Sequence, residues 1–153
     1  MITTSRTRFG LGRIYLSATA EARRRGDRRV GTEHLLLAVL VDADSVPARA
    51  FGVSSTTAHD ALQTMDDIAL ASLGITAGEL GRAVIPGHER DRLRLTPAAR
   101  AVFTGLRRRA GDDRISVTHV LLTLLDCVRP DPVADLIDAL GVDRDAVRER
   151  LRH

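Results

Sequence analysis

The chain repeats itself, and this repeat constrains the fold more than any other feature of the sequence. Residues 12–41 align without a gap with residues 97–126, an offset of 85 positions. Both copies contain an amphipathic stretch that ends in arginines and a glycine, followed by an apolar stretch that begins near a histidine, His34 or His119. Each copy is therefore one supersecondary unit that covers the apolar face of the other.

The spacing of apolar residues predicts two helices in each copy. Apolar residues recur at three- and four-residue intervals over 11–22 and 98–110, which is the period of an amphipathic helix. The stretches that follow, about 32–42 and 117–128, are apolar around most of their circumference. Such helices belong at the centre of a bundle.

A shorter pattern occurs three times and marks helix ends. It consists of a glycine, an apolar residue and a Ser, Thr or Asp, and it begins at Gly52, Gly74 and Gly141. Glycine favours the left-handed position that ends a helix, and the polar residue caps the next helix. After the second of these patterns, Thr76 and Glu79 have the spacing of a capping box.

Together these patterns predict an all-α fold of two tandem pseudo-repeats, with about ten short helices and no strand. We expect one domain over residues 1–153, with repeat one at about 9–84, a linker at about 85–93 and repeat two at about 94–152. The composition agrees, because only 3% of residues are aromatic and none is Trp. A core of Leu, Ala and Val favours helices over strands.

The basic residues exclude several kinds of chemistry. All 23 residues of the combined Lys and Arg count are arginine. Without lysine, the chain itself offers neither a phosphate-binding P-loop nor a Schiff-base nucleophile. The sequence also contains no nucleophile elbow, paired-carboxylate site or metal-ligand cluster in linear form. We therefore expect no enzymatic activity, no cofactor and no metal.

The location of the protein is predicted from segments that the sequence lacks. The stretch from Met1 to Gly10 has no apolar run of the kind found in signal peptides. No segment approaches the roughly 18 apolar residues that cross a bilayer. We expect a cytoplasmic protein that does not contact membranes, and the arginine-rich composition favours a bacterial source. The single cysteine, Cys127, lies in an apolar run and is expected to be an ordinary thiol in or near the core.

The string from Val30 to Leu37, VGTEHLLL, resembles the Clp N-terminal domain, also called the Clp repeat domain. The segment from Leu95 to Val102 is similar to the start of the second repeat in that family, and the likeness covers about residues 9–151. The resemblance implies a docking module at the front of ClpA- and ClpC-type AAA+ unfoldases. It would recognise protein substrates or adaptors, or sequester ligands of a full-length unfoldase. No AAA+ module follows, so we expect a free-standing copy.

The resemblance also implies a partner-binding site in each repeat. In ClpC-type members the glutamate of this motif pairs with the guanidinium group of arginine-phosphorylated substrates. Glu33 matches that position in the first repeat, whereas Thr118 occupies it in the second. Thr32, His34 and His119 complete the residues expected at the two sites. A simpler interpretation stays open, because an acid in the first helical turn is favoured by the helix dipole alone and the histidines can be structural.

Two arginine clusters could hold phosphate or acidic groups, because a guanidinium group offers a bidentate fork. Arg23, Arg24 and Arg25 lie near the end of the first amphipathic helix, and Arg107 and Arg108 lie at the corresponding place in the second copy. The helix dipole alone also favours basic residues at a helix C-terminus. The sequence leaves both interpretations open.

A helix-turn-helix regulator that binds nucleic acid is the alternative function. Residues 69–80 have the order of helix, glycine turn and helix that such proteins show. This stretch lies in a segment of net negative charge, 65–93, whereas duplex binding needs a basic face. The final helix is richer in basic residues, with acids interspersed: Arg144, Arg148, Arg150 and Arg152. We therefore expect protein or peptide partners rather than nucleic acid.

Overall fold

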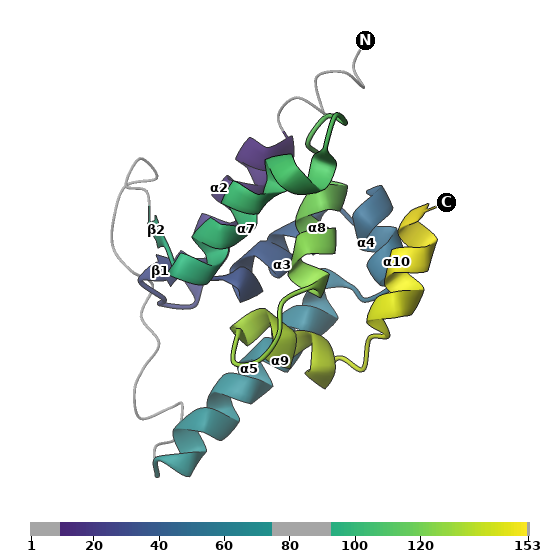
Figure 1. The fold of residues 1–153 in the computed structure, drawn as a ribbon. Helices are drawn as coiled ribbons and strands as arrows, with labels where there is room; N and C mark the ends of the chain where they lie inside the picture. Colours follow the sequence, from purple (N-terminus) through teal and green to yellow (C-terminus); the bar gives the residue numbers. More distant parts are fainter. Residues whose placement is uncertain (1–9, 75–92, 153) are drawn as a thin grey trace.

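The computed structural model describes residues 10–74 and 93–152 and shows a bundle of short helices (Figure 1). The elements of the first part are α2 (Gly10–Arg24), β1 (Arg29–Val30), α3 (Thr32–Val41), α4 (Val46–Phe51) and α5 (Ser55–Ser72). Those of the second part are β2 (Arg94–Leu95), α7 (Pro97–Ala110), α8 (Val117–Leu125), α9 (Pro132–Ala139) and α10 (Arg144–Arg152). The all-α prediction is confirmed. The expectation of about ten helices needs correction, since the described residues form eight.

Helix α3 lies at the centre of the bundle, as its apolar sequence predicts. Every side chain from His34 to Leu40 is buried. Helix α2 packs along α3, and α7 packs along α8 in the same way. The amphipathic period explains this packing, because α2 turns Ile14, Ala18 and Ala22 inward on one stripe.

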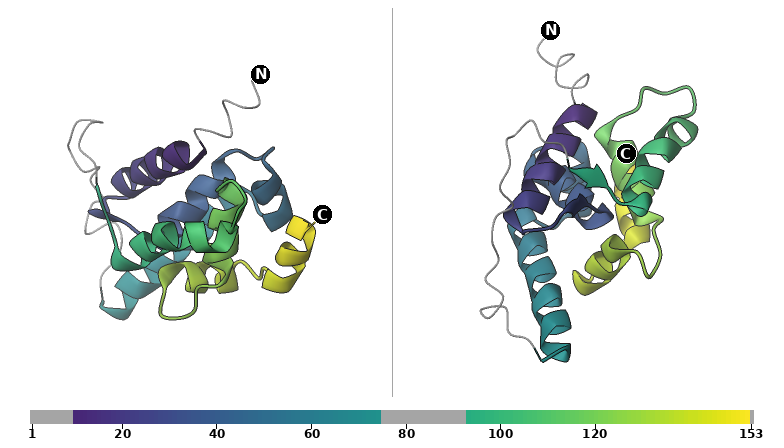
Figure 2. Two further views of the ribbon diagram at one scale, coloured as in Figure 1. Left: turned by 45° about the horizontal axis from the view of Figure 1, so that its top comes forward. Right: turned by 90° about the vertical axis from the view of Figure 1, so that its left-hand side faces the viewer.

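The two repeats interlock through their later helices. Helix α4 of the first repeat packs against α10 of the second, and α5 of the first packs against α9 of the second. Both pairings are visible in Figures 1 and 2. The Arg150 side chain at the end of the chain donates from Nε to the Ala50 carbonyl oxygen at 2.7 Å. The two repeats therefore share one hydrophobic core.

The structure corrects the expectation that no strand is present. Strands β1 and β2 pair in parallel, with Arg29 opposite Arg94 and Val30 opposite Leu95. The Thr96 N–H extends the ladder by donating to the Val30 carbonyl oxygen at 2.9 Å. Two residues are too few for an alternating pattern to be recognised in sequence. The pair holds the start of α3 close to the start of α7.

The glycine pattern marks helix ends where the structure describes it. Gly52 and Gly141 have φ angles of 79° and 68°, in the left-handed region that lets a helix end. After Gly52, the Ser54 hydroxyl accepts the Thr57 N–H at 3.1 Å and caps α5. After Gly141, an Asp143 carboxylate oxygen accepts the Ala146 N–H at 3.2 Å and caps α10 in the same manner.

Several predictions concern residues that the structure does not describe. The capping box of Thr76 and Glu79, most of the linker at 85–93 and the second half of the helix-turn-helix candidate at 69–80 lie outside the described residues. The division of the chain into two repeats and a linker at those positions therefore stays a prediction. Among the helices that are described, none is long and apolar enough to cross a membrane.

Candidate functional site

Both histidines of the repeated motif hold the start of their own helix. The Nδ1 atom of His34 accepts the Gly31 N–H at 2.9 Å, and the Nδ1 atom of His119 accepts the Ser116 N–H at 3.0 Å. These N–H groups precede α3 and α8, where backbone donors have no partner within the helix. Each ring thus has a structural partner inside its own repeat.

The other nitrogen of His34 belongs to a charged network beneath α3. Its Nε2 lies 2.8 Å from an Asp27 carboxylate oxygen. Because Nδ1 accepts an N–H, the neutral ring carries its proton on Nε2 and donates it to Asp27. Arg25 is buried; its Nε lies 3.5 Å from Asp27, and its guanidinium group also pairs with Asp66 on α5. This network ties the turn after α2 to α5.

Sequence reasoning did not identify Asp27 and Asp66 as partners of Arg25. Asp27 follows the glycine after α2, and an acidic residue at this place is typical of an ordinary turn. Asp66 lies 41 residues from Arg25, on a face of α5 that no local pattern distinguishes. The burial of Arg25 is what indicates that it needs acidic partners. This burial is seen in the packed structure but not in the sequence.

Glu33 is the residue of this site with the chemistry to bind a cation. Its side chain is 18% exposed, and this burial raises the pKa of the carboxyl group above its ordinary value. The carboxylate bends back over the start of α3, so that a Cβ placed on Gly31 would lie 1.9 Å from Glu33 Oε1. His34 Nδ1 lies 3.5 Å from the same oxygen but already accepts a hydrogen bond. Among the described residues, no arginine forms an ion pair with Glu33.

Thr32 is turned away from solvent, with only 1% of its surface exposed. Its hydroxyl donates to the Asp131 carboxylate and accepts the Val133 N–H at 3.3 Å. Asp131 is also the N-cap of α9. Thr32 therefore joins the start of α3 to the start of α9, which links the first repeat to the second.

The second repeat preserves the backbone of this site but not its charges. Thr118 and His119 are half-buried at the start of α8. Thr118 has no carboxylate to offer at the position of Glu33, and Ala110 stands at the position of Arg25. The structure therefore contains one acidic helix start of this kind among the residues it describes.

The predicted arginine clusters do not form a single surface. Arg25 is buried, while Arg23 is half-buried and Arg24 is exposed and pairs with Glu21 at 3.2 Å. In the second copy, Arg107 donates to backbone carbonyls of the turn that follows α7. Arg108 is exposed. Arg25 and Arg107 thus stabilise the fold, whereas the other three arginines lie at separate, more exposed positions.

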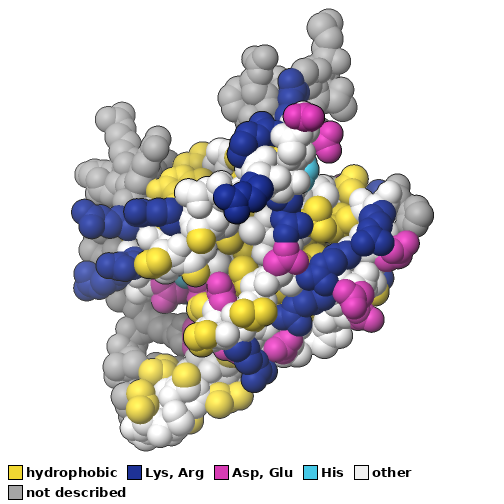
Figure 3. All heavy atoms as spheres, in the orientation of Figure 1, with side chains coloured by type: hydrophobic (Ala, Val, Ile, Leu, Met, Phe, Trp, Pro, Cys, Tyr) yellow, Lys and Arg dark blue, Asp and Glu magenta, His cyan; other side chains and the backbone are white. Residues whose placement is uncertain are grey.

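The arginines of α10 are engaged within the protein. They lie next to acidic side chains on this face of the molecule (Figure 3). Arg144 pairs with Asp138 at 2.8 Å, and its hydrogen bond holds the pKa of that carboxyl below its ordinary value. Arg148 donates to the Leu125 carbonyl oxygen at 3.1 Å and so helps to satisfy the C-terminus of α8. These contacts do not favour the nucleic-acid alternative, which needs free cations.

Cys127 is half-buried and packs against the core, as predicted. Burial, with the nearby Asp131 charge, raises the pKa of its thiol to about 11. A thiol of this kind is a poor nucleophile, because the thiolate is the reactive form. Within residues 10–74 and 93–152, no group of three His, Cys, Asp or Glu side chains is placed to hold a metal ion.

Comparison with known proteins identifies one family. The family described as the Clp repeat (R) N-terminal domain matches residues 13–129, about three quarters of the chain. The matched span includes the starts of both α3 and α8. No curated protein matches the chain.

Proposed function

The chain belongs to the Clp repeat N-terminal domain family, a family of protein-interaction modules, and on that premise we propose that it docks substrates or adaptors of the Clp system. In this proposal the polypeptide partner binds at the start of α3, and the protein itself carries out no reaction. The whole chain acts as one docking domain in the cytoplasm. The partner is recognised through an arginine side chain.

The proposal rests on the burial of the Glu33 carboxylate. Its carboxylate is largely removed from water, which disfavours the charged form and raises its pKa. No arginine of the described residues forms an ion pair with it, and the nearby charge of Arg25 offsets the burial only in part. A cation from a partner would offset this loss of hydration, and guanidinium is the best suited because its planar fork matches a carboxylate.

The position of Glu33 also suits a phosphorylated arginine. Glu33 lies in the first turn of α3, a helix of 10 residues. The N-terminus of a helix is the positive end of its dipole and attracts phosphate groups. Phosphoarginine carries a guanidinium group and a phosphoryl group side by side, so both can be met at this helix start. Because Thr118 replaces the carboxylate in the second repeat, we expect one such site in the chain.

The proposal is tested by the affinity of a labelled peptide that carries one phosphoarginine, measured by fluorescence anisotropy. The same peptide with unmodified arginine shows what the phosphoryl group contributes. Glu33→Gln should weaken binding about tenfold or more, as expected for the loss of a charge-assisted contact. Thr118→Val, at the corresponding position of the second repeat, is the matched control and should bind like the wild type. Equal binding by Glu33→Gln and wild type, or no binding by either, contradicts the proposal.

A further inference from the structure

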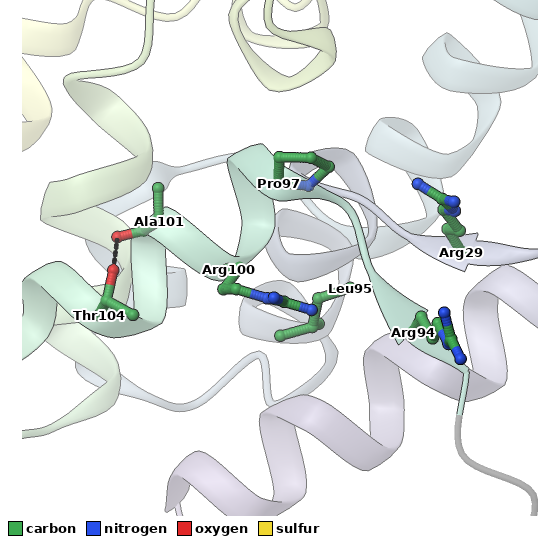
Figure 4. Close-up of a pocket in the computed structure, with 7 residues that line it drawn as sticks. All are labelled: Arg29, Arg94, Leu95, Pro97, Arg100, Ala101 and Thr104. Carbon is green, nitrogen blue, oxygen red and sulfur yellow. Dashed lines mark hydrogen bonds between the residues drawn. The ribbon is translucent and has the colours of Figure 1, made fainter.

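A hollow lies where β1, β2 and α7 meet, and three arginines from these three elements line it. Its volume is about 400 Å³. Arg29 comes from β1 and Arg94 from β2, while Arg100 extends from the first turn of α7 beside Leu95 (Figure 4). Leu95 and Pro97 provide apolar surface between the cations.

The register of the two strands places like charges opposite each other. Arg29 and Arg94 are partners across the parallel ladder. Like charges that face each other across a ladder destabilise a sheet. In the described part of the chain, no carboxylate forms an ion pair with Arg29, Arg94 or Arg100. Among residues 10–74 and 93–152, the fold therefore gathers positive charge here without an acidic partner.

The arginines of α10 differ from those of the hollow, because most of them have acidic partners. Arg144 pairs with Asp138 at 2.8 Å and Arg152 with Glu149 at 3.1 Å. Figure 3 shows basic side chains gathered at the edge of the molecule where β1 and β2 lie. Since the repeat offset does not relate Arg29 to Arg94, this cluster is a product of the fold and is invisible in the repeat.

We propose that this hollow binds the carboxylate groups of an acidic segment in a partner polypeptide. Three guanidinium groups present several forks for carboxylates. The arginine side chains are exposed, so the hollow suits an extended chain better than a small molecule, which needs an enclosing pocket. The apolar surface of Leu95 and Pro97 fits an aliphatic side chain between two acids. This inference rests on the proposed function in one respect, because the proposed function is what makes the partner a polypeptide.

The test uses the full chain and a labelled peptide in which Asp and Glu alternate with Leu. A second peptide, with Asn and Gln in place of the acids, reports binding without charge. The variant is Arg94→Gln/Arg100→Gln. The control is Arg13→Gln/Arg49→Gln, which removes the same charge from exposed side chains on α2 and α4 that have no ion-pair partner in the described structure.

We expect the hollow variant to bind the acidic peptide about tenfold more weakly, the effect of losing two partly exposed ion pairs. The control variant should lose less than half of the affinity. The thermal midpoint of the hollow variant should stay equal to that of the wild type or rise, because the repulsion across the ladder is removed. Affinity then falls without any loss of stability, which a merely structural role would not produce.

Three results would overturn the proposal: equal losses in the two variants, equal binding of the neutral peptide, or tighter binding of duplex DNA that disappears in the hollow variant. Glu33→Gln separates this proposal from the proposed function. It should leave the acidic peptide bound as in the wild type while the phosphoarginine peptide is lost. If the phosphoarginine peptide fails to bind the wild type and the acidic peptide still binds through Arg94 and Arg100, the Glu33 site is wrong and the hollow stands.

Discussion

The Oε1 atom of Glu33 lies in the space that a side chain on Gly31 would need, 1.9 Å from the position of an added Cβ. A side chain at position 31 would have to displace the flexible Glu33 carboxylate, while the Gly31 backbone itself is ordinary and extended, with φ of −101°. The second repeat agrees with this explanation. It has Thr118 in place of Glu33 and Ser116 in place of Gly31, so a side chain is accommodated where the carboxylate is missing.

Gly31→Ser should displace the Glu33 carboxylate toward solvent. Serine is itself a good N-cap, so the free energy of unfolding should change by less than about 1 kcal/mol. The pKa of Glu33 should fall toward its ordinary value, since the burial that raises it is lost. A carbon-13 NMR titration of the Glu33 carboxyl group measures this. Gly105→Ser, at a glycine of α7 with open space around it, is the control. An unchanged Glu33 pKa in Gly31→Ser would show that the contact does not matter.

Stability should depend on pH through Glu33. Its pKa in the folded protein is raised above the ordinary value of 4.5, so the folded state binds the proton more tightly than the unfolded state. The resulting stabilisation is present below that ordinary value and is lost as pH rises through the folded pKa. Glu33→Gln should therefore gain stability relative to the wild type as the pH is raised from acid to neutral.

Urea unfolding at several pH values measures this difference. Asp60→Asn removes a carboxylate from an exposed position of α5 and serves as the control. The free energy of unfolding of Glu33→Gln should rise relative to that of the wild type as the pH rises. If it does not, or if Asp60→Asn shows an equal rise, the carboxyl group of Glu33 is not desolvated as described.

Thr32→Val should weaken the junction of the two repeats. Valine has nearly the same shape but cannot donate to Asp131 or accept the Val133 N–H. The Val133 N–H keeps a second acceptor in the Asp131 carboxylate, at 3.2 Å, so the main loss is the buried bond from the hydroxyl to that carboxylate, about 1–3 kcal/mol. Chemical denaturation gives the value, and Thr56→Val on the exposed side of α5 is the matched substitution. Equal small losses in the free energy of unfolding of the two variants would mean that the Thr32 hydroxyl contributes nothing to stability.

Cys127 should react slowly with thiol reagents while the protein is folded. Its pKa of about 11, against an ordinary 9.0, lowers the thiolate fraction about 100-fold. The rate of alkylation at mildly alkaline pH, followed by mass spectrometry in buffer and in urea, should differ by that order. Similar rates in the two conditions would refute the environment described for this thiol.

The sequence predicts the helical framework because its signals are local. Thr96 followed by Pro97 is the sequence pattern of a helix N-cap, and the Thr96 hydroxyl accepts the Ala99 N–H at 3.1 Å. The apolar circumference of α3 likewise predicts its central place, and the structure confirms it. These features depend on residues a few positions apart, which is the range over which helical periodicity and capping act.

The contacts of the candidate site could not be predicted in the same way. Arg25 meets Asp66, Thr32 meets Asp131, and both pairs are joined only by packing between distant helices. The β1 and β2 pair, which creates the arginine hollow, involves two residues on each side and follows from the path of the chain. Sequence patterns identify which residues could carry the chemistry, but tertiary packing decides which of them are buried and which face a partner.

A proton–nitrogen NMR titration with the phosphoarginine peptide would locate the bound peptide on the chain. Binding at Glu33 should shift the signals of residues 31–34, at the start of α3, and these shifts should be lost in Glu33→Gln. Residues 116–119, where Thr118 replaces the carboxylate, should show no comparable shifts. Shifts of equal size at both helix starts, or shifts at 31–34 that persist in Glu33→Gln, would show that Glu33 is not the residue that holds the partner.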